Sequence, residues 1–160
     1  MAVELKDNSF AVKVAINDTT IAWLHEWARE IESHAKRNCS TGEEYSSQLR
    51  GSYDSNVNEG KGVAKIGSPL EQAYWEEWGT GEYAAHGDGR KGWWVYKDGY
   101  KGNGGKQLTE AEAKAIAARS PSLHATNGRK PNYTLEKAFT VNRPKAEADL
   151  AKKLKARLSK

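Results

Sequence analysis

The segment His25-Glu26-Trp27-Ala28-Arg29 has the residue types of the first half of a zinc-protease helix. Such a helix binds its metal through two histidines one turn apart, with the glutamate as general base. Arg29 stands where the second histidine is required, and His34, His86 and His124 share no ligand spacing. The sequence therefore predicts no metal site.

A second candidate is the carboxylate pair Glu76 and Glu77, which lies between Trp75 and Trp78. Two carboxylates beside aromatic rings are typical of glycosidases, in which they flank the scissile bond. Neighbouring residues of a helix point about 100° apart, so this pair is poorly placed for that task. Cys39 lies in no nucleophile motif. We therefore expect no enzymatic activity.

The glycine run that ends at Gly105-Lys106 resembles a phosphate-binding loop only in composition. No glycine has the four-residue spacing that the motif requires, and Gln107 replaces the hydroxyl that would hold magnesium. The run predicts a loop, and no cofactor is expected.

The apolar mass of the 160 residues is concentrated in six Trp and seven Tyr, against two Phe and one Met. Such side chains suit surfaces that are exposed before assembly and buried after it, although they also fill small cores. The length predicts a single domain, residues 1–160. Candidate interface residues are Trp75, Trp78, Trp93, Trp94, Leu150, Leu154 and Leu158.

Charge is divided unevenly along the chain. From Arg129 onward there are ten Lys/Arg and three Asp/Glu, a net charge of +7, which leaves −3 for the rest of the total of +4. This polarity indicates two faces with different partners, or a solvated C-terminal helix. The residues that could face DNA or an acidic partner are Lys152, Lys153, Lys155 and Arg157. The N-terminus shows no signal peptide and no apolar run is long enough to span a membrane, so a reducing cytoplasm is expected.

Periodicity predicts the first half of the chain. Alternating apolar residues over 2–16 predict a strand hairpin, and Asp18 then caps a long amphipathic helix over 19–37. Residues 45–55 and 62–66 are expected to be extended. Ser68-Pro69-Leu70-Glu71 predicts a helix start, with Ser68 as cap and Pro69 at the first helical position.

In the second half, Gly79 should end that helix with a positive φ, and residues 79–106 should be a glycine-rich loop containing a strand over 93–96. Thr109 opens a capping box and a helix to about Arg119. Pro131 and Pro144 are each expected to open a helix, the second a basic one over 144–159. The predicted fold class is α+β, with a small curved antiparallel or mixed sheet packed on the long helix.

Four segments resemble, in this order, the neck and tail-component family of long-tailed bacteriophages. They are Thr41-Gly42, Leu49-Arg50-Gly51-Ser52, Tyr74-Trp75-Glu76-Glu77-Trp78-Gly79-Thr80-Gly81 and the stretch from Gly128 to Phe139. The resemblance covers about residues 18–158. The chain departs from the pattern by a longer spacing after Thr41-Gly42, by Trp78 in place of phenylalanine and by an inserted helix at 109–119.

The resemblance implies a structural subunit of the head–tail junction, a neck or tail-completion ring of sixfold or twelvefold symmetry. Its implied partners are the portal, adaptor or head-closure protein on one side and the tail-terminator or tail-tube protein on the other, with non-specific DNA contact in the lumen. It implies a virion protein assembled in the host cytoplasm. Gly79, Thr80 and Gly81 are then a structural turn. Two alternatives remain: a phage cell-wall enzyme or carbohydrate-binding module, favoured by the tryptophans, and a nucleic-acid-binding accessory protein, favoured by the basic tail.

Overall fold

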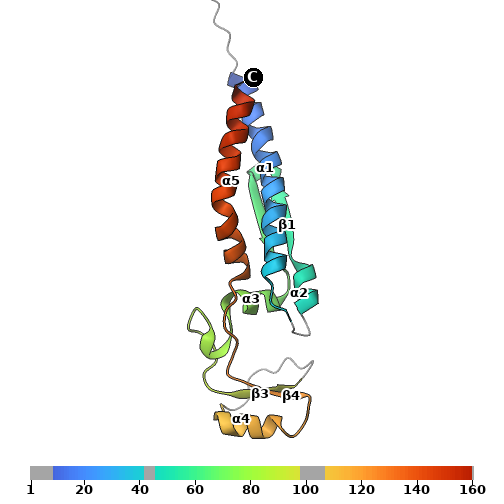
Figure 1. Ribbon diagram of the computed structural model, residues 1–160, viewed down its shortest axis with the longest axis vertical. Helices are drawn as coiled ribbons and strands as arrows, with labels where there is room; N and C mark the ends of the chain where they lie inside the picture. The colour runs from blue at the N-terminus through green and yellow to red at the C-terminus, as the bar shows by residue number, and fades with distance from the viewer. Residues whose placement is uncertain (1–8, 42–45, 98–106, 160) are drawn as a thin grey trace, which may run out of the picture. The chain divides into compact units, whose positions relative to one another are not determined.

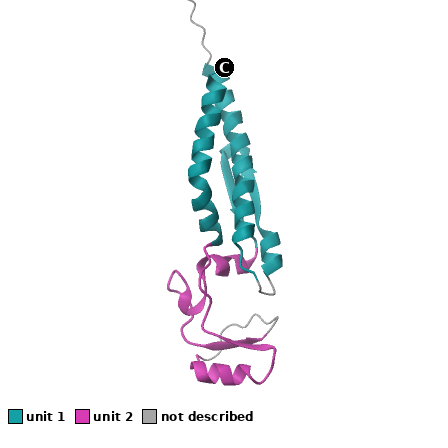
Figure 2. Cartoon of the chain, in the orientation of Figure 1, with its two compact units in different colours: residues 1–69, 134–160 teal, residues 70–133 magenta. Residues whose placement is uncertain are grey.

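Five α-helices and two small antiparallel sheets are formed by residues 9–41, 46–97 and 107–159, the part of the chain that this computed structural model describes. The predicted α+β class is therefore confirmed. The chain divides into two compact units, coloured separately in Figure 2. Unit 1 comprises residues 1–69 and 134–160, and unit 2 comprises residues 70–133. Each unit is described by itself.

Unit 1 is built on two long helices, α1 (Ser9–Asn38) and α5 (Thr134–Leu158), which run side by side in opposite directions (Figure 1). Small residues line the contact, because Ala28 and Ala35 of α1 and Ala138 and Ala146 of α5 are all buried. Small side chains let the two backbones approach closely, which excludes water along the seam. The pairing of these two helices is thus the main packing contact of unit 1.

A β-hairpin lies against α1 (Figure 1). Its strands, β1 (Asp54–Asn58) and β2 (Val63–Gly67), pair one to one, with Asp54 opposite Gly67 and Asn58 opposite Val63. A single 3-10 turn, η1 (Glu59–Lys61), connects them, and Gly62 follows it with a φ of 61°. The short helix α2 (Ser46–Ser52) precedes the hairpin and buries Leu49.

The hairpin and α5 lie on nearly opposite sides of α1. Ser55 of β1 donates a hydrogen bond to Glu32 at 2.6 Å. Trp27, on the other side, donates from Nε1 to Asp149 of α5 at 3.0 Å. Five residues separate Trp27 and Glu32 along α1, which corresponds to about 140° around the helix. Unit 1 therefore has three layers, with α1 in the middle.

Unit 2 contains α3 (Glu71–Trp78), a 3-10 turn η2 (Gly81–Tyr83), β3 (Trp94–Lys97), α4 (Glu110–Ala117) and β4 (Leu123–Thr126). β3 and β4 are antiparallel, and α4 packs on them. The predicted strand near Trp93 and the capping box of Thr109 are confirmed, since the Thr109 hydroxyl accepts from the Glu112 N–H and the Glu112 carboxylate accepts in return.

The strand hairpin predicted at the N-terminus is wrong for residues 9–16, which belong to α1; residues 2–8 lie outside the described part. Neither glycine nor proline interrupts Ser9–Asn38, so Asp18 lies inside the helix and not at its cap. The alternation of Val12, Val14 and Ile16 buries no sheet face, because these side chains are 38–42% exposed.

Three further predictions are corrected. Residues 46–52 form α2 and are not extended. Leu70, not Ser68, is the N-cap of α3, without a side-chain cap, and Ser68 instead bonds to Ser52 at 2.6 Å. Pro131 precedes a helix without opening it, and Pro144 lies inside the single helix α5. Pro144 is tolerated because it is exposed, while the buried Asn142 and Ala146 on either side hold the helix in place.

Of the helices described, none combines the length and apolar character needed to cross a bilayer.

Candidate functional site

Two segments of unit 2 that are distant in sequence, 76–82 and 127–133, lie side by side and are called here the paired segments. Backbone hydrogen bonds join them at three levels. Asn132 donates to the Glu76 carbonyl at 2.8 Å, Thr80 to the Arg129 carbonyl at 2.8 Å, and Glu82 to the Asn127 carbonyl at 2.9 Å. The end of α3 and the chain that enters α5 are therefore held together.

A buried carboxylate reinforces this pairing. Glu76 has 0% exposure, and its Oε2 lies 2.7 Å from Nη2 of Arg129. Its Oε1 accepts a hydrogen bond from Nδ2 of Asn132 at 2.7 Å. A buried carboxylate is tolerated only when charge and hydrogen bonds compensate for the lost water. Arg129 and Asn132 supply both, so Glu76 is a structural anchor of the paired segments.

The Gly79-Thr80-Gly81 turn is shaped by the same contact. Gly79 has a φ of 73°, and a Cβ there would lie 2.7 Å from the Arg129 carbonyl oxygen. Gly81 has a φ of 60°, and its Cβ would lie 2.3 Å from the Asn127 carbonyl oxygen. The Thr80 hydroxyl accepts from the Arg129 N–H at 3.0 Å. The positive φ predicted for Gly79 at the end of α3 is confirmed, and the close approach of the second segment is a further reason for glycine at this position.

The carboxylate pair considered as catalytic is not accessible. Glu76 is fully buried in its ion pair, and Glu77 is only 7% exposed. A general acid and a nucleophile must both reach the bond between two sugars. This geometry does not favour a glycosidase.

Trp78, Trp93 and Trp94 of unit 2 each have a defined neighbour. The Trp78 ring lies 4.7 Å from that of His86 and meets Tyr133 edge-on at 6.3 Å. The Arg90 guanidinium lies 5.0 Å from the Trp94 ring, and the Lys114 ammonium 5.6 Å from that of Trp93. All six tryptophans of the chain, Trp75 included, are of intermediate exposure. They contribute to the packing of each unit and still present aromatic surface.

The predicted leucine stripe of α5 is only partly buried within unit 1. Leu150 and Leu154 are half-buried, whereas Leu158 is 49% exposed. Each four-residue step advances about 400° around a helix, so five steps place Leu158 about 200° from Ala138. The stripe therefore winds away from α1 towards the C-terminus.

The four basic residues of α5 that were predicted to face DNA or an acidic partner divide into two groups. Lys153 Nζ contacts Glu26 of α1 and lies 2.8 Å from Asp149, which also accepts from Trp27. The hydrogen bond from Lys153, and then that from Trp27, lowers the pKa of Asp149, and the bonds to Asp149 and Glu26 raise the pKa of Lys153. Lys152, Lys155 and Arg157 are exposed. Lys153 thus joins α1 to α5, and the other three remain oriented to solvent.

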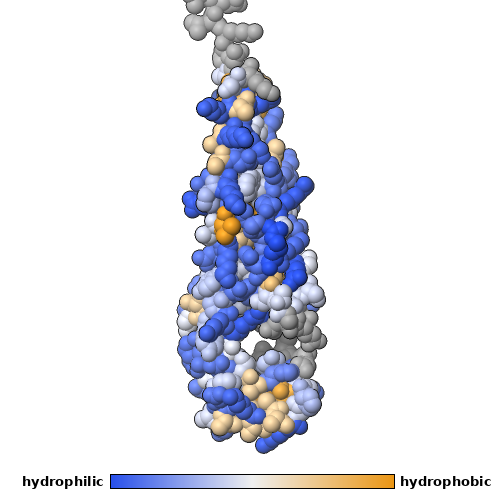
Figure 3. Space-filling model, in the orientation of Figure 1, coloured by the Kyte–Doolittle hydropathy of each residue, from blue (hydrophilic) through white to orange (hydrophobic). Residues whose placement is uncertain are grey.

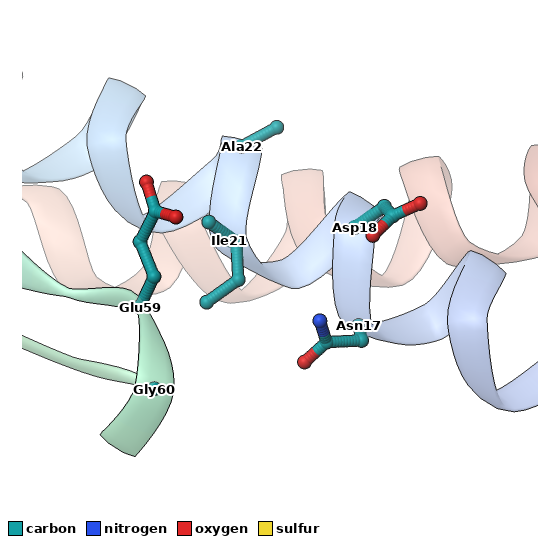
Figure 4. A pocket seen from close by; sticks show the side chains of 6 residues that line it. All are labelled: Asn17, Asp18, Ile21, Ala22, Glu59 and Gly60. Carbon is teal, nitrogen blue, oxygen red and sulfur yellow. The ribbon is translucent and has the colours of Figure 1, made fainter.

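A shallow depression of about 470 Å³ lies between α1 and the hairpin turn (Figure 4). Its lining residues are Asn17, Asp18, Ile21, Ala22, Glu59 and Gly60. Oε1 of Glu59 lies 2.9 Å from Nε2 of His25. Within the described ranges, no group of three or more His, Cys, Asp or Glu side chains could hold a metal ion.

The visible surface of unit 1 is largely hydrophilic, with isolated apolar residues (Figure 3). Among the exposed apolar side chains of α1 and α5, Phe10 is 79% and Phe139 is 52% exposed. Val12, Val14 and Ile16 are also exposed, so the exposed apolar side chains of α1 gather near its start. The rest of the face in view is suited to polar contacts.

The sequence predicts the turn at Gly79, but it indicates Glu76 only as a poorly placed catalytic candidate and gives no role to Arg129 or Asn132. Their position in the Gly128–Phe139 segment was the available signal, although nothing local indicated which residues they contact. Comparison of the chain with protein-family models, curated proteins and solved structures gave no match.

Proposed function

We propose that this chain is a non-enzymatic structural subunit of the head–tail junction of a long-tailed bacteriophage. It acts as a neck or tail-completion ring between the portal or adaptor complex and the tail tube. The proposal rests on the resemblance of its motifs, in their order along the chain, to that family.

The paired segments are the observation that carries the proposal. The two longest motifs of the resemblance, Tyr74–Gly81 and Gly128–Phe139, meet through Glu76, Arg129 and Asn132. Motifs that bind each other across the fold have a structural reason to occur together. Their residues are used for backbone turns and a buried ion pair, which fits a scaffold protein better than a catalytic one.

The character of the surface also supports assembly. Neighbouring proteins can pack on several surfaces of this chain. These are the tryptophans of intermediate exposure, the exposed Lys152, Lys155 and Arg157, and the two outer edges of the β1–β2 hairpin, which no other described strand joins. The cell-wall enzyme is the weaker alternative, because Glu76 and Glu77 are buried. The nucleic-acid-binding alternative has only the exposed basic residues of α5 in its favour.

The proposal is tested by complementation in vitro. An amber codon at Trp23, introduced into the phage that carries the gene, should yield DNA-filled heads and free tails. Added purified protein should join them into infectious particles, and the Arg129→Ala variant should do so poorly. Normal particles in the amber mutant, or no joining by the wild-type protein, would overturn the proposal.

A further inference from the structure

The hairpin of unit 1 ends in two unpaired strand edges. β1 and β2 form a sheet of two strands, and no other described strand joins it. A two-stranded hairpin has half of its backbone N–H and C=O groups directed outwards, where another strand can bind them. Neither strand contains proline, and the five residue pairs run one to one without a bulge. Both edges are therefore straight enough to accept a further strand.

We propose that these edges join successive copies of this chain, with β2 of one copy pairing antiparallel to β1 of the next, so that the hairpins form one continuous sheet around a ring. The proposal rests on the proposed function, since it specifies the contact that would build the ring.

Symmetry favours this arrangement. In a ring whose axis runs along the strands, every β1 points one way and every β2 the other. Neighbouring copies then bring β2 beside an antiparallel β1, which repeats the pairing already present within the hairpin. Two different surfaces in contact, repeated by rotation, are what a closed ring requires.

Charge favours pairing of unlike edges over pairing of like edges. Lys65 is the central residue of β2, so a twofold pairing of β2 with β2 in the centred register would place Lys65 against Lys65. In β1 the corresponding charge is acidic, at Asp54. Pairing of β2 with β1 in the register of the hairpin places Lys65 opposite Asn56 and diagonal to Asp54. Only the unlike pairing therefore brings opposite charges together.

The layers of unit 1 leave room for such a sheet. Two strands span about 10 Å, which is close to the diameter of the single helix that covers them. Ser55 and Glu32 fix the hairpin on one side of α1, and Trp27 and Asp149 fix α5 nearly opposite. α5 therefore lies behind α1 and not at a strand edge. Hairpins can line up edge to edge while each carries its own helices.

The face of the sheet turned away from α1 would line the ring. Its exposed side chains are Asp54, Asn56, Asn58, Val63 and Lys65. They are mostly polar and include one acid and one base, so the lining would be nearly neutral. Such a surface allows a polyanion to pass without binding it tightly.

Cross-linking between two single-cysteine variants tests the contact. Asn56→Cys and Lys65→Cys are made separately in a Cys39→Ala background, mixed and oxidised under mild conditions, alone and with portal-bearing heads. Asp54→Cys and Asn58→Cys, each mixed with Lys65→Cys, cover a register shifted by two residues. Asn56→Cys mixed with Ala151→Cys, on the exposed side of α5, is the control.

We expect covalent dimers from a β1 variant mixed with the β2 variant, and little from either alone or from the control. Amide exchange in residues 54–58 and 63–67 should slow at least tenfold in the oligomer. Dimers from one variant alone would indicate twofold pairing and overturn the proposal. A ring that forms without these cross-links would overturn it while the proposed function stands. If the chain forms no oligomer, even with heads present, both the proposed strand contact and the proposed function are wrong.

Discussion

The Arg129 guanidinium lies 2.7 Å from a Glu76 carboxylate that has no exposed surface. Removal of the arginine leaves a buried charge without its main partner, which is far more costly than loss of a surface ion pair. This pair is the place at which a single substitution can weaken the contact between the paired segments of unit 2.

Arg129→Ala should destabilise the protein by about 3 kcal/mol, because Glu76 stays buried while its charge is no longer neutralised. Urea unfolding followed by tryptophan fluorescence measures the effect. Lys91→Ala, also in unit 2 but exposed, is the matched control and should change stability by less than about 0.5 kcal/mol. Equal effects of the two substitutions would contradict a structural role for the pair.

Gly79→Ala and Gly87→Ala should differ although both glycines have a φ of 73°. A Cβ at Gly79 meets the Arg129 carbonyl, whereas nothing lies within 4 Å at Gly87. Backbone strain alone should cost about 1–2 kcal/mol at Gly87, and the clash should add at least about 1 kcal/mol at Gly79. Gly79→Val should destabilise the protein by at least as much as Gly79→Ala. Similar unfolding midpoints for the two alanine variants would show that close approach is unimportant.

The C-terminal end of α5 should dock through its leucines more than through its charge. Leu158→Asp changes an exposed side chain, so the fold should survive and head–tail joining should fall at least tenfold. Lys152→Glu combined with Lys155→Glu should leave most joining intact, and it avoids Lys153, which is bound within unit 1. If the charge reversal blocks joining and Leu158→Asp does not, binding is electrostatic and should weaken steeply with salt.

Stability should fall in acid. Hydrogen bonds from Lys36, then Ser55, hold the pKa of Glu32 below its ordinary value of 4.5. The unfolded chain therefore binds protons more readily, so this stabilisation is present above pH 4.5 and is lost as the pH falls through the folded pKa. Urea midpoints between about pH 6 and about pH 3 measure it. Ser55→Ala should make the urea midpoint depend less on pH. If the dependence on pH is unchanged in this variant, the hydrogen bond from Ser55 to Glu32 does not contribute to the loss of stability in acid.

Purified protein should release neither sugar nor peptide from bacterial cell walls. Both Glu76 and Glu77 are buried, which prevents the approach of a polymer. Release of reducing sugar by the wild-type protein, lost in Glu77→Gln, would establish the enzyme alternative instead.

Local signals in the sequence predicted local structure well. Gly79 and the Thr109 capping box act within a few residues, and both are found as expected. The apolar alternation near Val12 was misleading because alternation indicates a strand only when one face is buried. Pro144 predicts a helix start because its missing N–H usually excludes proline from a helix interior, yet it lies inside α5. Packing against α1 outweighed that preference.

Contacts between distant segments could not be predicted from one sequence. Nothing near Arg129 indicates that it neutralises Glu76, and nothing near Lys153 indicates that it reaches Glu26. The regular spacing of the leucines in α5 predicted a stripe, but spacing by four residues drifts around the helix. Leu158 is therefore exposed although Ala138, on the same four-residue row, is fully buried.

Unit 1 is discontinuous, because residues 70–133 lie between its two parts in the sequence. During translation α1 leaves the ribosome long before α5. Ala28 and Ala35 therefore cannot be buried against α5 until Thr134 and the residues after it have been synthesised. Unit 2 is continuous and can close its Glu76–Arg129 pair first. A nascent chain should therefore acquire protease resistance in its middle before its beginning. Release of the chain before α5 is made would leave α1 without its helical partner, with Ala28 and Ala35 uncovered, and would make the chain a substrate for the cell's quality control.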